Sequence, residues 1–414
     1  MNNLKKTLSE KISSRKKLVR IEDYEPWIGG RSVDRILKKA RLLKDLHVVH
    51  VNSTYYGGGV SVLLSSLTLL MNTLGIKTGW RLIQGEPDFF AVTKKMHNAL
   101  QGGRMNLSER KKRIYEDVIY QNSVRNHLEE HDVVVIHDPQ PLPLITHYRK
   151  KAPWIWRCHI DMTQPQKEVW DYLKQFVELY DAVIFSLKDY RQKLKTPQFF
   201  FMPAIDPFTI KNKELTDRAI QERLKRYQIP TDLPLVVQIS RFDRWKDPEG
   251  VVKAFKLASK KAPCTLVLIG NVATDDPEGE KVYQTLLKNR GKRIIVSSYG
   301  DDTALVNALQ RRAAVILQKS IREGFGLTVA EAMWKGTPVI GGNVGGIRYQ
   351  IKDGENGFLV SSVAEAAERI VLLVKNKDLR EKMGKEAKEA VRRNFLLPRY
   401  LEQHLDLLIR LTSS

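Results

Sequence analysis

Short runs of apolar residues recur along the chain and are separated by segments with the spacing of amphipathic helices. In the first half, the runs fall at 46–53, 132–138, 154–161, 181–187 and 198–206. In the second half, they fall at 233–242, 264–271, 293–299, 313–320 and 337–343. Unbroken apolar runs of this length are typical of strands buried on both faces of a parallel sheet. Their alternation with helices predicts right-handed βαβ units, so we expect an α/β fold.

A polar segment at 211–234 separates the two sets of strands. Since 414 residues are too many for one typical domain, we predict two doubly wound, Rossmann-like domains, at 1–210 and 211–390. A helical segment at 391–414, broken at Pro398, could cross back to the first domain. Ligands of such sheets bind beyond the carboxyl ends of the strands, which places a site in a cleft between the domains.

The net charge of +22 suggests an anionic partner. However, the Lys and Arg residues are spread over many segments such as "RILKKARLLK", which resemble the solvated faces of amphipathic helices. No zinc-finger or RNP motif occurs, so we expect no nucleic-acid partner and keep nucleic-acid binding as the alternative from a different functional class. A basic surface would still attract small anionic substrates.

Segments for targeting or cross-linking are not evident. The longest apolar stretch is shorter than the ~20 residues that a membrane span needs, and the basic N-terminus has no apolar core of a secretory signal. We expect a cytoplasmic protein in which Cys158 and Cys264 are reduced core thiols. Charge-rich helices and few cysteines also favour a thermophilic source.

The first strand leads into a glycine-rich turn, "VNSTYYGGGVSVLL". Gly57 to Gly59 precede a helix expected from Val60. Glycines allow close approach of a ligand, and the unpaired N–H groups of a helix start attract anions. The stretch matches neither G-x-G-x-x-G nor a P-loop, so an ordinary tight turn is the alternative.

Two basic residues follow the first strand of the second half, in "ISRFDRWKDP". The guanidinium of Arg241 and the ammonium of Lys246 could clamp a diphosphate. Surface salt bridges to Asp243 or Asp247 are the alternative. The position just past a strand end favours the functional interpretation.

The stretch "SIREGFGLTVAEAMWKG" places Glu323 before a predicted helix and Glu331 within it, with Gly336 closing the helix. Two carboxylates are compatible with a glycosidase, which holds them astride one bond. A glycine turn at a helix start instead favours anion binding by the N–H groups of residues 324–328. The helix start between the two acids favours the second interpretation, and a capped helix with two solvated acids is the further alternative.

Two further predicted strands end in polar residues, in "HDPQPLPL" and "WRCHID". His137 and Asp138 end one strand, and His159 and Asp161 end the next. A single histidine is usually structural, but two polar strand ends side by side suggest a sugar pocket. Arg157 is the only basic residue at this place that could serve a phosphorylated substrate.

Taken together, "EGFGLTVAE", "SRFDRWKDP", the glycine-rich first loop and "RCHID" resemble the retaining glycosyltransferases of family 4, which have the GT-B fold. "VVVIHDPQPLPLI", "RCHID" and "FFAVTKKMHNALQGG" are most similar to the trehalose glycosyltransferring synthases within that family. The resemblance implies transfer of glucose, with retention, from ADP-, UDP- or GDP-glucose to free glucose. Alternatives on the same fold are a trehalose phosphorylase and an enzyme similar to sucrose-phosphate synthase.

The resemblance also implies roles for individual residues. Arg241 and Lys246 would bind the diphosphate, while Glu323 would hold hydroxyls of the donor glucose. His159 would contact its 6-hydroxyl, and Glu331 would bind the ribose. The remaining donor contacts would come from Gly58, Gly59, Gly324, Phe325, Gly326, Leu327 and Thr328. Acceptor contacts would come from His137, Asp138 and Asp161.

Cofactors and partners follow from the same resemblance. The chain has no Asp-x-Asp pair, the usual carboxylate grip on a metal-bound diphosphate. We therefore expect no protein-bound Mg²⁺ and no metal site, with charge neutralised by Arg241, Lys246 and the helix start. The expected partners are a nucleotide-sugar, small sugars and a second copy of the chain in a homodimer. The first loop has three glycines and no nearby Arg, which departs from the family pattern.

Overall fold

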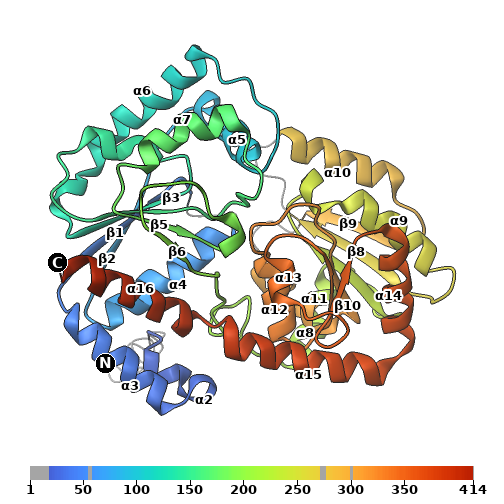
Figure 1. Ribbon diagram of the computed structural model, residues 1–414. Coiled ribbons are helices and arrows are strands. Elements are labelled where there is room, and N and C mark those ends of the chain that lie inside the picture. The colour runs from blue at the N-terminus through green and yellow to red at the C-terminus, as the bar shows by residue number, and fades with distance from the viewer. Residues whose placement is uncertain (1–17, 55–57, 271–276, 299–301, 414) are drawn as a thin grey trace, which may run out of the picture.

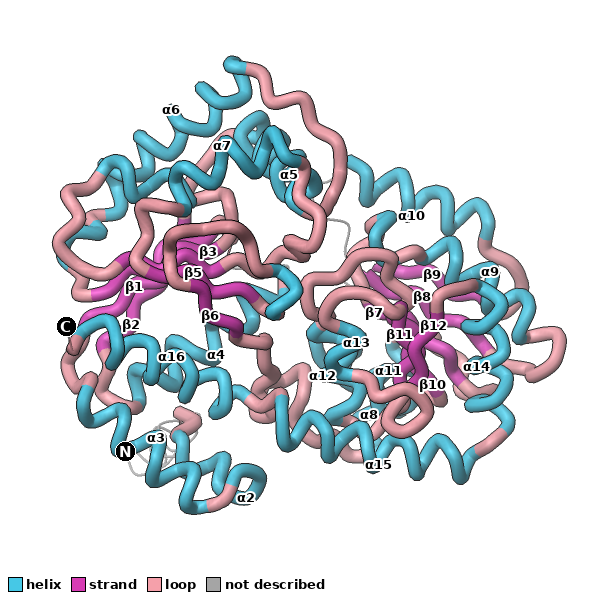
Figure 2. The backbone as a smooth tube through the Cα atoms, in the orientation of Figure 1, coloured by secondary structure: helices cyan, strands magenta, loops and turns pink. Residues whose placement is uncertain are grey.

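The protein consists of two lobes, each built around one six-stranded parallel sheet (Figure 1). The computed structural model describes residues 18–54, 58–270, 277–298 and 302–413. Helices cover both faces of each sheet in the tube view as well (Figure 2). The predicted α/β class with two doubly wound sheets is confirmed.

The first sheet has the strand order β2-β1-β3-β4-β5-β6. Its strands are β1 (His47–Asn52), β2 (Lys77–Leu82), β3 (Val133–His137), β4 (Trp154–Arg157), β5 (Ala182–Phe185) and β6 (Gln198–Phe200). The five predicted apolar runs all contain a strand, and β4 and β6 end well before the predicted limits of 161 and 206. Because β4 stops at Arg157, the following residues 158–161 form a loop at the sheet edge.

The second sheet has the strand order β12-β11-β10-β7-β8-β9. Its strands are β7 (Leu235–Ile239), β8 (Thr265–Gly270), β9 (Ile294–Ser298), β10 (Val315–Gln318), β11 (Val339–Gly342) and β12 (Phe358–Val360). All the paired strands are parallel. In each sheet the first strand lies between two partners, β1 between β2 and β3 and β7 between β8 and β10, as helical crossovers in a doubly wound sheet require.

Two edge strands, β2 and β12, were absent from the prediction. The strand β2 (KTGWRL) has no fully buried residue, so it lacks the apolar run that marks a central strand. The strand β12 has three residues, which is too short for a pattern to be recognised. Edge strands are partly solvated, and their sequence signal is accordingly weak.

Helices pack on both faces of the first sheet. They are η1 (Ile21–Tyr24), α2 (Glu25–Ile28), α3 (Gly30–Leu42), α4 (Gly59–Thr73), α5 (Pro87–Leu100), α6 (Glu109–Asn126), η2 (Leu128–Glu130), η3 (Leu142–His147), α7 (Lys167–Val177) and η4 (Lys188–Tyr190). One apolar core joins the sheet to α5, α6 and α7. A second core, on the opposite face, joins it to α3 and α4.

The second sheet is covered in the same manner. Its helices are α8 (Asp217–Arg226), η5 (Arg244–Lys246), α9 (Pro248–Ala258), α10 (Pro277–Asn289), α11 (Thr303–Arg312), α12 (Leu327–Trp334), α13 (Ile347–Gln350), α14 (Val363–Lys375) and α15 (Lys377–Asn394). The helices α8, α11 and α12 share one core with the sheet, while α9 and α14 share the other.

The last helix, α16 (Leu397–Thr412), packs against α3 and α4 in the core of the first lobe (Figures 1 and 2). An isolated bridge between Ile205 and Leu396 ties the return segment to the chain that leaves the first sheet. The helix break comes at residues 395–396, before Pro398, which lies in the first turn of α16. Proline is tolerated there because the first-turn N–H groups have no intrahelical acceptor. The domain limits at 210 and 390 stay predictions.

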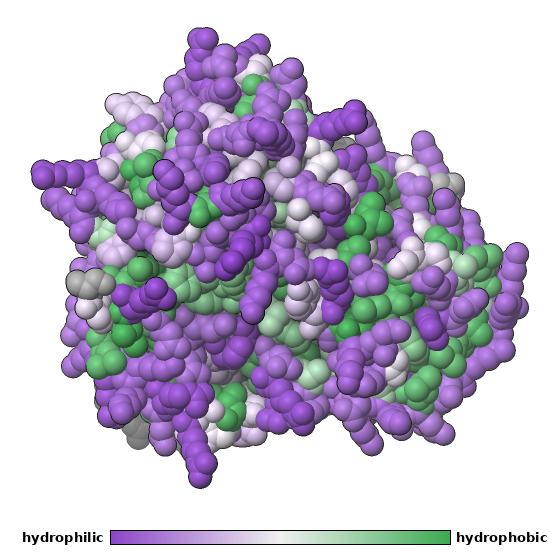
Figure 3. Space-filling model, in the orientation of Figure 1, coloured by the Kyte–Doolittle hydropathy of each residue, from purple (hydrophilic) through white to green (hydrophobic). Residues whose placement is uncertain are grey.

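The face drawn in Figure 3 is mostly hydrophilic, and hydrophobic residues gather mainly over the second lobe, at the right of the view. Within the described ranges, no helix combines the length and the apolar character that a membrane crossing requires.

Candidate active site

A cavity of about 1120 Å³, which includes space open to solvent, lies between the carboxyl ends of the two sheets. Both lobes contribute to its walls. From the first lobe come Gly58, Gly59, Val60, Leu63, His97, Gln101, His159, Ile160 and Pro203. From the second come Lys211, Ser240, Arg241, Asp243, Trp245, Lys246, Gln318, Arg322, Glu323, Gly324, Phe325, Gly326, Leu327 and Thr328. The cavity therefore brings most of the predicted donor-binding residues together.

The floor of this cavity is the loop between β10 and α12. Gly326 adopts φ 84° at the start of α12, a left-handed conformation suited to glycine. The carbonyl groups of this loop are held from behind. The hydroxyl of Tyr190 donates to the carbonyl oxygens of Glu323 (3.1 Å) and Gly324 (2.8 Å). The amide of Gln350 donates to the carbonyl oxygen of Phe325 at 2.6 Å.

A trans peptide group points its N–H away from its C=O, so these contacts turn the N–H groups toward the cavity. Within the part of the chain that the structure describes, the N–H groups of residues 324–328 donate to no protein acceptor. Five consecutive free donors at a helix start form a site suited to an anion. This arrangement of N–H groups is compatible with the predicted anion-binding role of the turn.

Glu323 lies beside this turn and is 9% exposed. Its Oε2 accepts from the ammonium of Lys246 (2.5 Å) and from the amide of Gln318 (3.2 Å). The hydroxyl of Ser320 donates to the same oxygen at 3.1 Å. Because three donors meet at Oε2, the carboxylate is fixed in orientation and its Oε1 is the oxygen left for a ligand.

The other predicted base, Arg241, is partly exposed in the cavity wall. Its guanidinium lies 3.4 Å from Asp243, whose carboxylate also accepts from the backbone N–H of Trp245. The salt bridge between Arg241 and Asp243, which was the alternative to diphosphate binding, is thus present in the structure. Asp247 instead pairs with Lys319.

The glycine turn of the first lobe approaches the floor closely. Helix α4 begins at Gly59, one residue before the predicted start. A Cβ placed on Gly59 would lie 2.6 Å from Cδ1 of Leu327, so this glycine allows α4 to meet α12. Gly57 lies outside the described residues.

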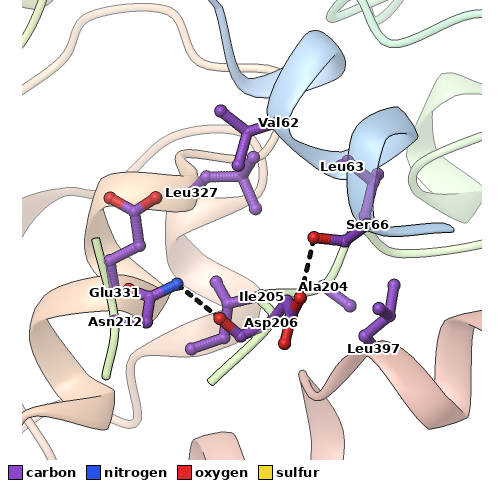
Figure 4. Close-up of a pocket in the computed structure, with 10 residues that line it drawn as sticks. All are labelled: Val62, Leu63, Ser66, Ala204, Ile205, Asp206, Asn212, Leu327, Glu331 and Leu397. Atoms are coloured by element: carbon purple, nitrogen blue, oxygen red, sulfur yellow. Dashed lines mark hydrogen bonds between the residues drawn. The ribbon is translucent and has the colours of Figure 1, made fainter. Parts of the chain in front are cut away.

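Glu331 lines a smaller adjoining cavity, shown in Figure 4, in which Leu327 lies beside Val62 of α4. The Glu331 side chain is 2% exposed. Its Oε1 lies 2.8 Å from Lys211 Nζ, and its Oε2 has no partner within the described part of the chain. A buried carboxylate oxygen without a donor is costly, which makes it a candidate ligand contact.

Of the predicted sugar-binding residues at the strand ends, only His159 lines the large cavity. His137 is 1% exposed and lies behind it, with Nδ1 at 3.0 Å from Nε2 of His159. Burial lowers the pKa values of both imidazoles well below the ordinary value, with a contribution from nearby charged or ionisable groups, so both are neutral.

The two aspartates serve the loops around them. Asp138 accepts from the backbone N–H of His159 at 2.7 Å, and burial raises the pKa of its carboxyl to about 6. Asp161 is 2% exposed and accepts from the backbone N–H of Thr163 at 2.9 Å. Arg157 is fully buried and donates to the carbonyl oxygen of Phe201 at 2.8 Å, among other buried partners.

The sequence interpretation did not single out the wall formed by His97 of α5 and Gln101, the residue that follows this helix. Gln101 Nε2 lies 3.1 Å from His97 Nδ1, and burial lowers the pKa of His97 to about 3. Trp245 completes this side, with an indole N–H that has no partner among the described residues. The segment containing His97 was quoted only for the family resemblance. His97 and Gln101, at i and i+4, could share one side of the helix, but Thr93 and Lys94 on the preceding turn are also polar, so no pattern marked them out.

Comparison with known proteins gives the family. Residues 50–192 match the family described as "Trehalose synthase, N-terminal domain", and residues 219–390 match "Glycosyl transferases group 1". The chain is 45% identical over 397 residues to the trehalose synthase of Thermococcus litoralis, covering 94% of this chain and 96% of that one. It is 36% identical to the trehalose synthase of Rubrobacter xylanophilus, with 94% and 97% covered.

The fold has a counterpart among solved structures. A UDP-forming α,α-trehalose-phosphate synthase from Burkholderia xenovorans superposes with a TM-score of 0.72 at 16% identity, covering 89% of this chain and 100% of that one. At this identity the likeness concerns the GT-B fold alone. The near full-length identity to the Thermococcus and Rubrobacter proteins shows more: the chain belongs to the trehalose synthase family of glycosyltransferases.

Proposed function

We propose that the protein transfers glucose, with retention of configuration, from a nucleoside-diphosphate glucose to free glucose and so forms trehalose. Membership of the trehalose synthase family supports the product. The observation that carries the donor class is the row of free N–H groups at 324–328 beside the Lys246–Glu323 pair. These groups suit a diphosphate better than a neutral ligand.

In the proposed complex the diphosphate lies on the N–H groups of residues 324–328. Arg241 and Lys246 neutralise its charge as the bond from glucose C1 to the phosphate oxygen breaks. The Oε1 of Glu323 accepts from donor-sugar hydroxyls, and His159 contacts the same sugar from the first lobe. Gly58 and Gly59 allow the close approach of α4 to the phosphates.

The proposed chemistry needs no protein nucleophile. The acceptor hydroxyl attacks C1 from the face that the diphosphate leaves, and its proton passes to the departing phosphate oxygen. One C–O bond breaks, one forms, and the nucleoside diphosphate carries away the electron pair. The protein contributes positioning and fixed charge, which are the terms available in a preorganised site.

The acceptor glucose is proposed to lie against His97, Gln101 and Trp245, on the side of the cavity away from Glu331. His137, Asp138 and Asp161 would then shape the pocket from behind without lining it. Since Arg157 is fully buried and engaged with protein groups, it offers no charge to an acceptor phosphate. This supports free glucose over a phosphorylated acceptor.

We further propose catalysis without a protein-bound metal ion and assembly as a homodimer. In the described ranges, no three His, Cys, Asp or Glu residues are grouped so as to hold a metal. Activity measured with and without EDTA tests the first point, and light scattering of the purified protein tests the second.

The central experiment incubates the protein with ADP-, UDP- or GDP-glucose and free glucose. We expect release of the nucleoside diphosphate and a non-reducing disaccharide of α,α linkage. Glu323→Ala is the control that removes the hydroxyl contact. Absence of disaccharide with every donor would refute the proposal, and phosphate-dependent release of glucose 1-phosphate from trehalose would identify a phosphorylase instead.

A further inference from the structure

Three histidines, two on the neighbouring strands β1 and β3 and one in the loop just after β4, form a chain that ends at the candidate active-site cavity. Nδ1 of His50, on β1, lies 2.9 Å from Nε2 of His137, at the end of β3. Nδ1 of His137 lies 3.0 Å from Nε2 of His159. His50 and His137 are each 1% exposed, whereas His159 lines the cavity. We call these three residues the histidine chain.

The ring of His159 is thereby fixed in orientation. Because its Nε2 is turned to His137, its Nδ1 is the nitrogen left for a substrate. The planes of the His137 and His159 rings differ by 18° and their centroids are 5.3 Å apart, which suits a hydrogen bond between ring nitrogens.

The direction of the hydrogen bonds along the chain has two possibilities. A neutral imidazole has one N–H, so the three residues must all carry it on Nδ1 or all on Nε2. If all carry it on Nε2, the N–H of His50 points into a small cavity where it has no acceptor within the described part of the chain. If all carry it on Nδ1, every N–H inside the chain has an acceptor.

The surroundings of His50 Nε2 favour the state in which all three histidines carry the proton on Nδ1. Its cavity is lined by apolar residues and by His404, and the structure gives no hydrogen bond between the two rings. His404 Nδ1 donates to the carbonyl oxygen of Tyr400 at 2.8 Å, so its Nε2 is an unprotonated acceptor, but this nitrogen is not within hydrogen-bond distance of any donor in the described part of the chain, His50 included. Buried N–H groups without an acceptor are rarer in proteins than buried acceptors without a donor.

We propose that His50 and His137 are positioning residues that fix the tautomer of His159, so that its Nδ1–H donates a hydrogen bond to an oxygen of the bound nucleotide-sugar. The inference rests on the proposed function only in taking the cavity as the substrate site. A donor at this position would act on a hydroxyl or phosphate oxygen and would reject a ligand group that can only donate. His159 would bind without exchanging a proton.

The test begins with the ligand-free enzyme, so that it does not depend on activity. ¹⁵N NMR of histidine-labelled protein separates protonated from unprotonated ring nitrogens, and single His→Gln variants assign the signals. We expect a proton on Nδ1 of His50, His137 and His159. A proton on Nε2 of His159 would overturn the proposal, whatever the enzyme makes.

Three variants then test the link from His50 to His159. His50→Leu removes the donor, and we expect His159 to lose its single tautomer and kcat/KM to fall roughly 10–100-fold, the scale for losing the partner that orients a functional histidine. In His50→Asn the side-chain amide can donate from the position of Nδ1. This variant should recover most of the single His159 tautomer and most of kcat/KM. His404→Leu replaces another buried histidine that lines the same cavity but lies outside the histidine chain. This variant should leave the tautomer of His159 unchanged.

If His50→Leu and His404→Leu have the same kinetic loss and the same His159 signals, His50 has only a packing role and the proposal is wrong. Should His50→Leu fail to fold, the tautomers of the wild type and of His50→Asn decide the question. If the tautomer is as proposed but no donor yields disaccharide, the proposed function fails while the histidine chain stands.

Discussion

The hydroxyl oxygen of Tyr190, in the first lobe, lies 2.8 Å from the carbonyl oxygen of Gly324 in the second. It also reaches the carbonyl oxygen of Glu323, so one side chain orients two peptide groups of the anion-binding turn. The contact joins the two lobes on the side of the turn opposite to the cavity. Closure of the cleft and the direction of the free N–H groups therefore depend on the same hydroxyl.

Removing this hydroxyl should loosen the turn. In Tyr190→Phe we expect weaker binding of the nucleoside diphosphate and a kcat/KM about 2–10-fold lower, corresponding to the ~0.5–1.5 kcal/mol net contribution of one hydrogen bond. Titration calorimetry and donor kinetics measure both. Tyr148→Phe is the matched control, since its hydroxyl also donates to a carbonyl, that of Ser123, away from the cavity. If both variants lost the same amount of binding affinity and kcat/KM, the Tyr190 hydroxyl would have no specific role in orienting the turn.

At Gly324 the backbones of the two lobes lie close together. A Cβ at this position would lie 2.4 Å from the carbonyl oxygen of His159, a backbone atom that cannot move aside alone. Gly324→Ala should therefore hold the cleft open, with a loss of ~100-fold or more in kcat, as expected when reacting groups are misplaced by about 1 Å. The melting temperature should change little. Gly291→Ala, whose nearest neighbour is 4.0 Å away, should keep its activity.

The pair of Lys246 and Glu323 should matter for the leaving group. Lys246→Met removes one fixed positive charge, and we expect kcat to fall about 100–1,000-fold, the scale for one preorganised electrostatic donor. Lys253→Met, on the exposed side of α9, is the control. A KM effect with unchanged kcat would mean that Lys246 binds ground state and transition state equally.

The sequence predicted the parts of the site that depend on local structure. The turn before α12 could be recognised because a buried strand, two glycines and a helical pattern follow one another within residues 313–334. The central strands were equally clear, since burial on both faces leaves an unbroken apolar run. The edge strands β2 and β12, which are short or half-exposed, left no such signal.

Contacts that depend on tertiary structure could not be read from the sequence. The members of the histidine chain are 87 and 22 positions apart, and their contact follows from the strand order of the sheet. The same holds for Tyr190, 134 positions from Gly324. Which polar residues at a strand end face the cavity, and which lie behind it, depends on where each strand stops.

We expect Glu331 to accept hydrogen bonds from the ribose hydroxyls of the nucleotide. Its Oε2 is buried without a partner, and two ribose hydroxyls would satisfy it. Glu331→Gln should weaken nucleoside diphosphate binding by ~1.5–3 kcal/mol, the scale of a hydrogen bond to a charged group. The wild type should bind the 2′-deoxy analogue less tightly, whereas the variant should discriminate little. Calorimetry with both nucleotides measures this, with the exposed Glu355→Gln as control; undiminished discrimination in Glu331→Gln would assign the ribose elsewhere.

Several buried neutral histidines should make the fold sensitive to acid. Burial lowers the pKa of His50 to about 4 and the pKa values of His97 and His404 to about 3. Below pH ~6.5 the unfolded chain binds protons that the native imidazoles do not, so stability falls as pH drops from ~6.5 toward 4. The raised pKa of Asp138, about 6, acts in the opposite direction, because the native state keeps that proton longer.

The histidines outnumber this aspartate, so the net effect should be a loss of stability on acidification. Each buried histidine contributes a slope of at most ~1.4 kcal/mol per pH unit to the free energy of unfolding. Denaturant unfolding at a series of pH values between 4.5 and 7.5 measures the total slope. His404→Leu removes one titrating group outside the site and should reduce the slope by about one proton. A slope unchanged in His404→Leu would mean that His404 is protonated in the native state. A slope that is flat over the whole range would mean that the buried imidazoles as a group are protonated, which would also remove the single N–H per ring on which the histidine chain depends.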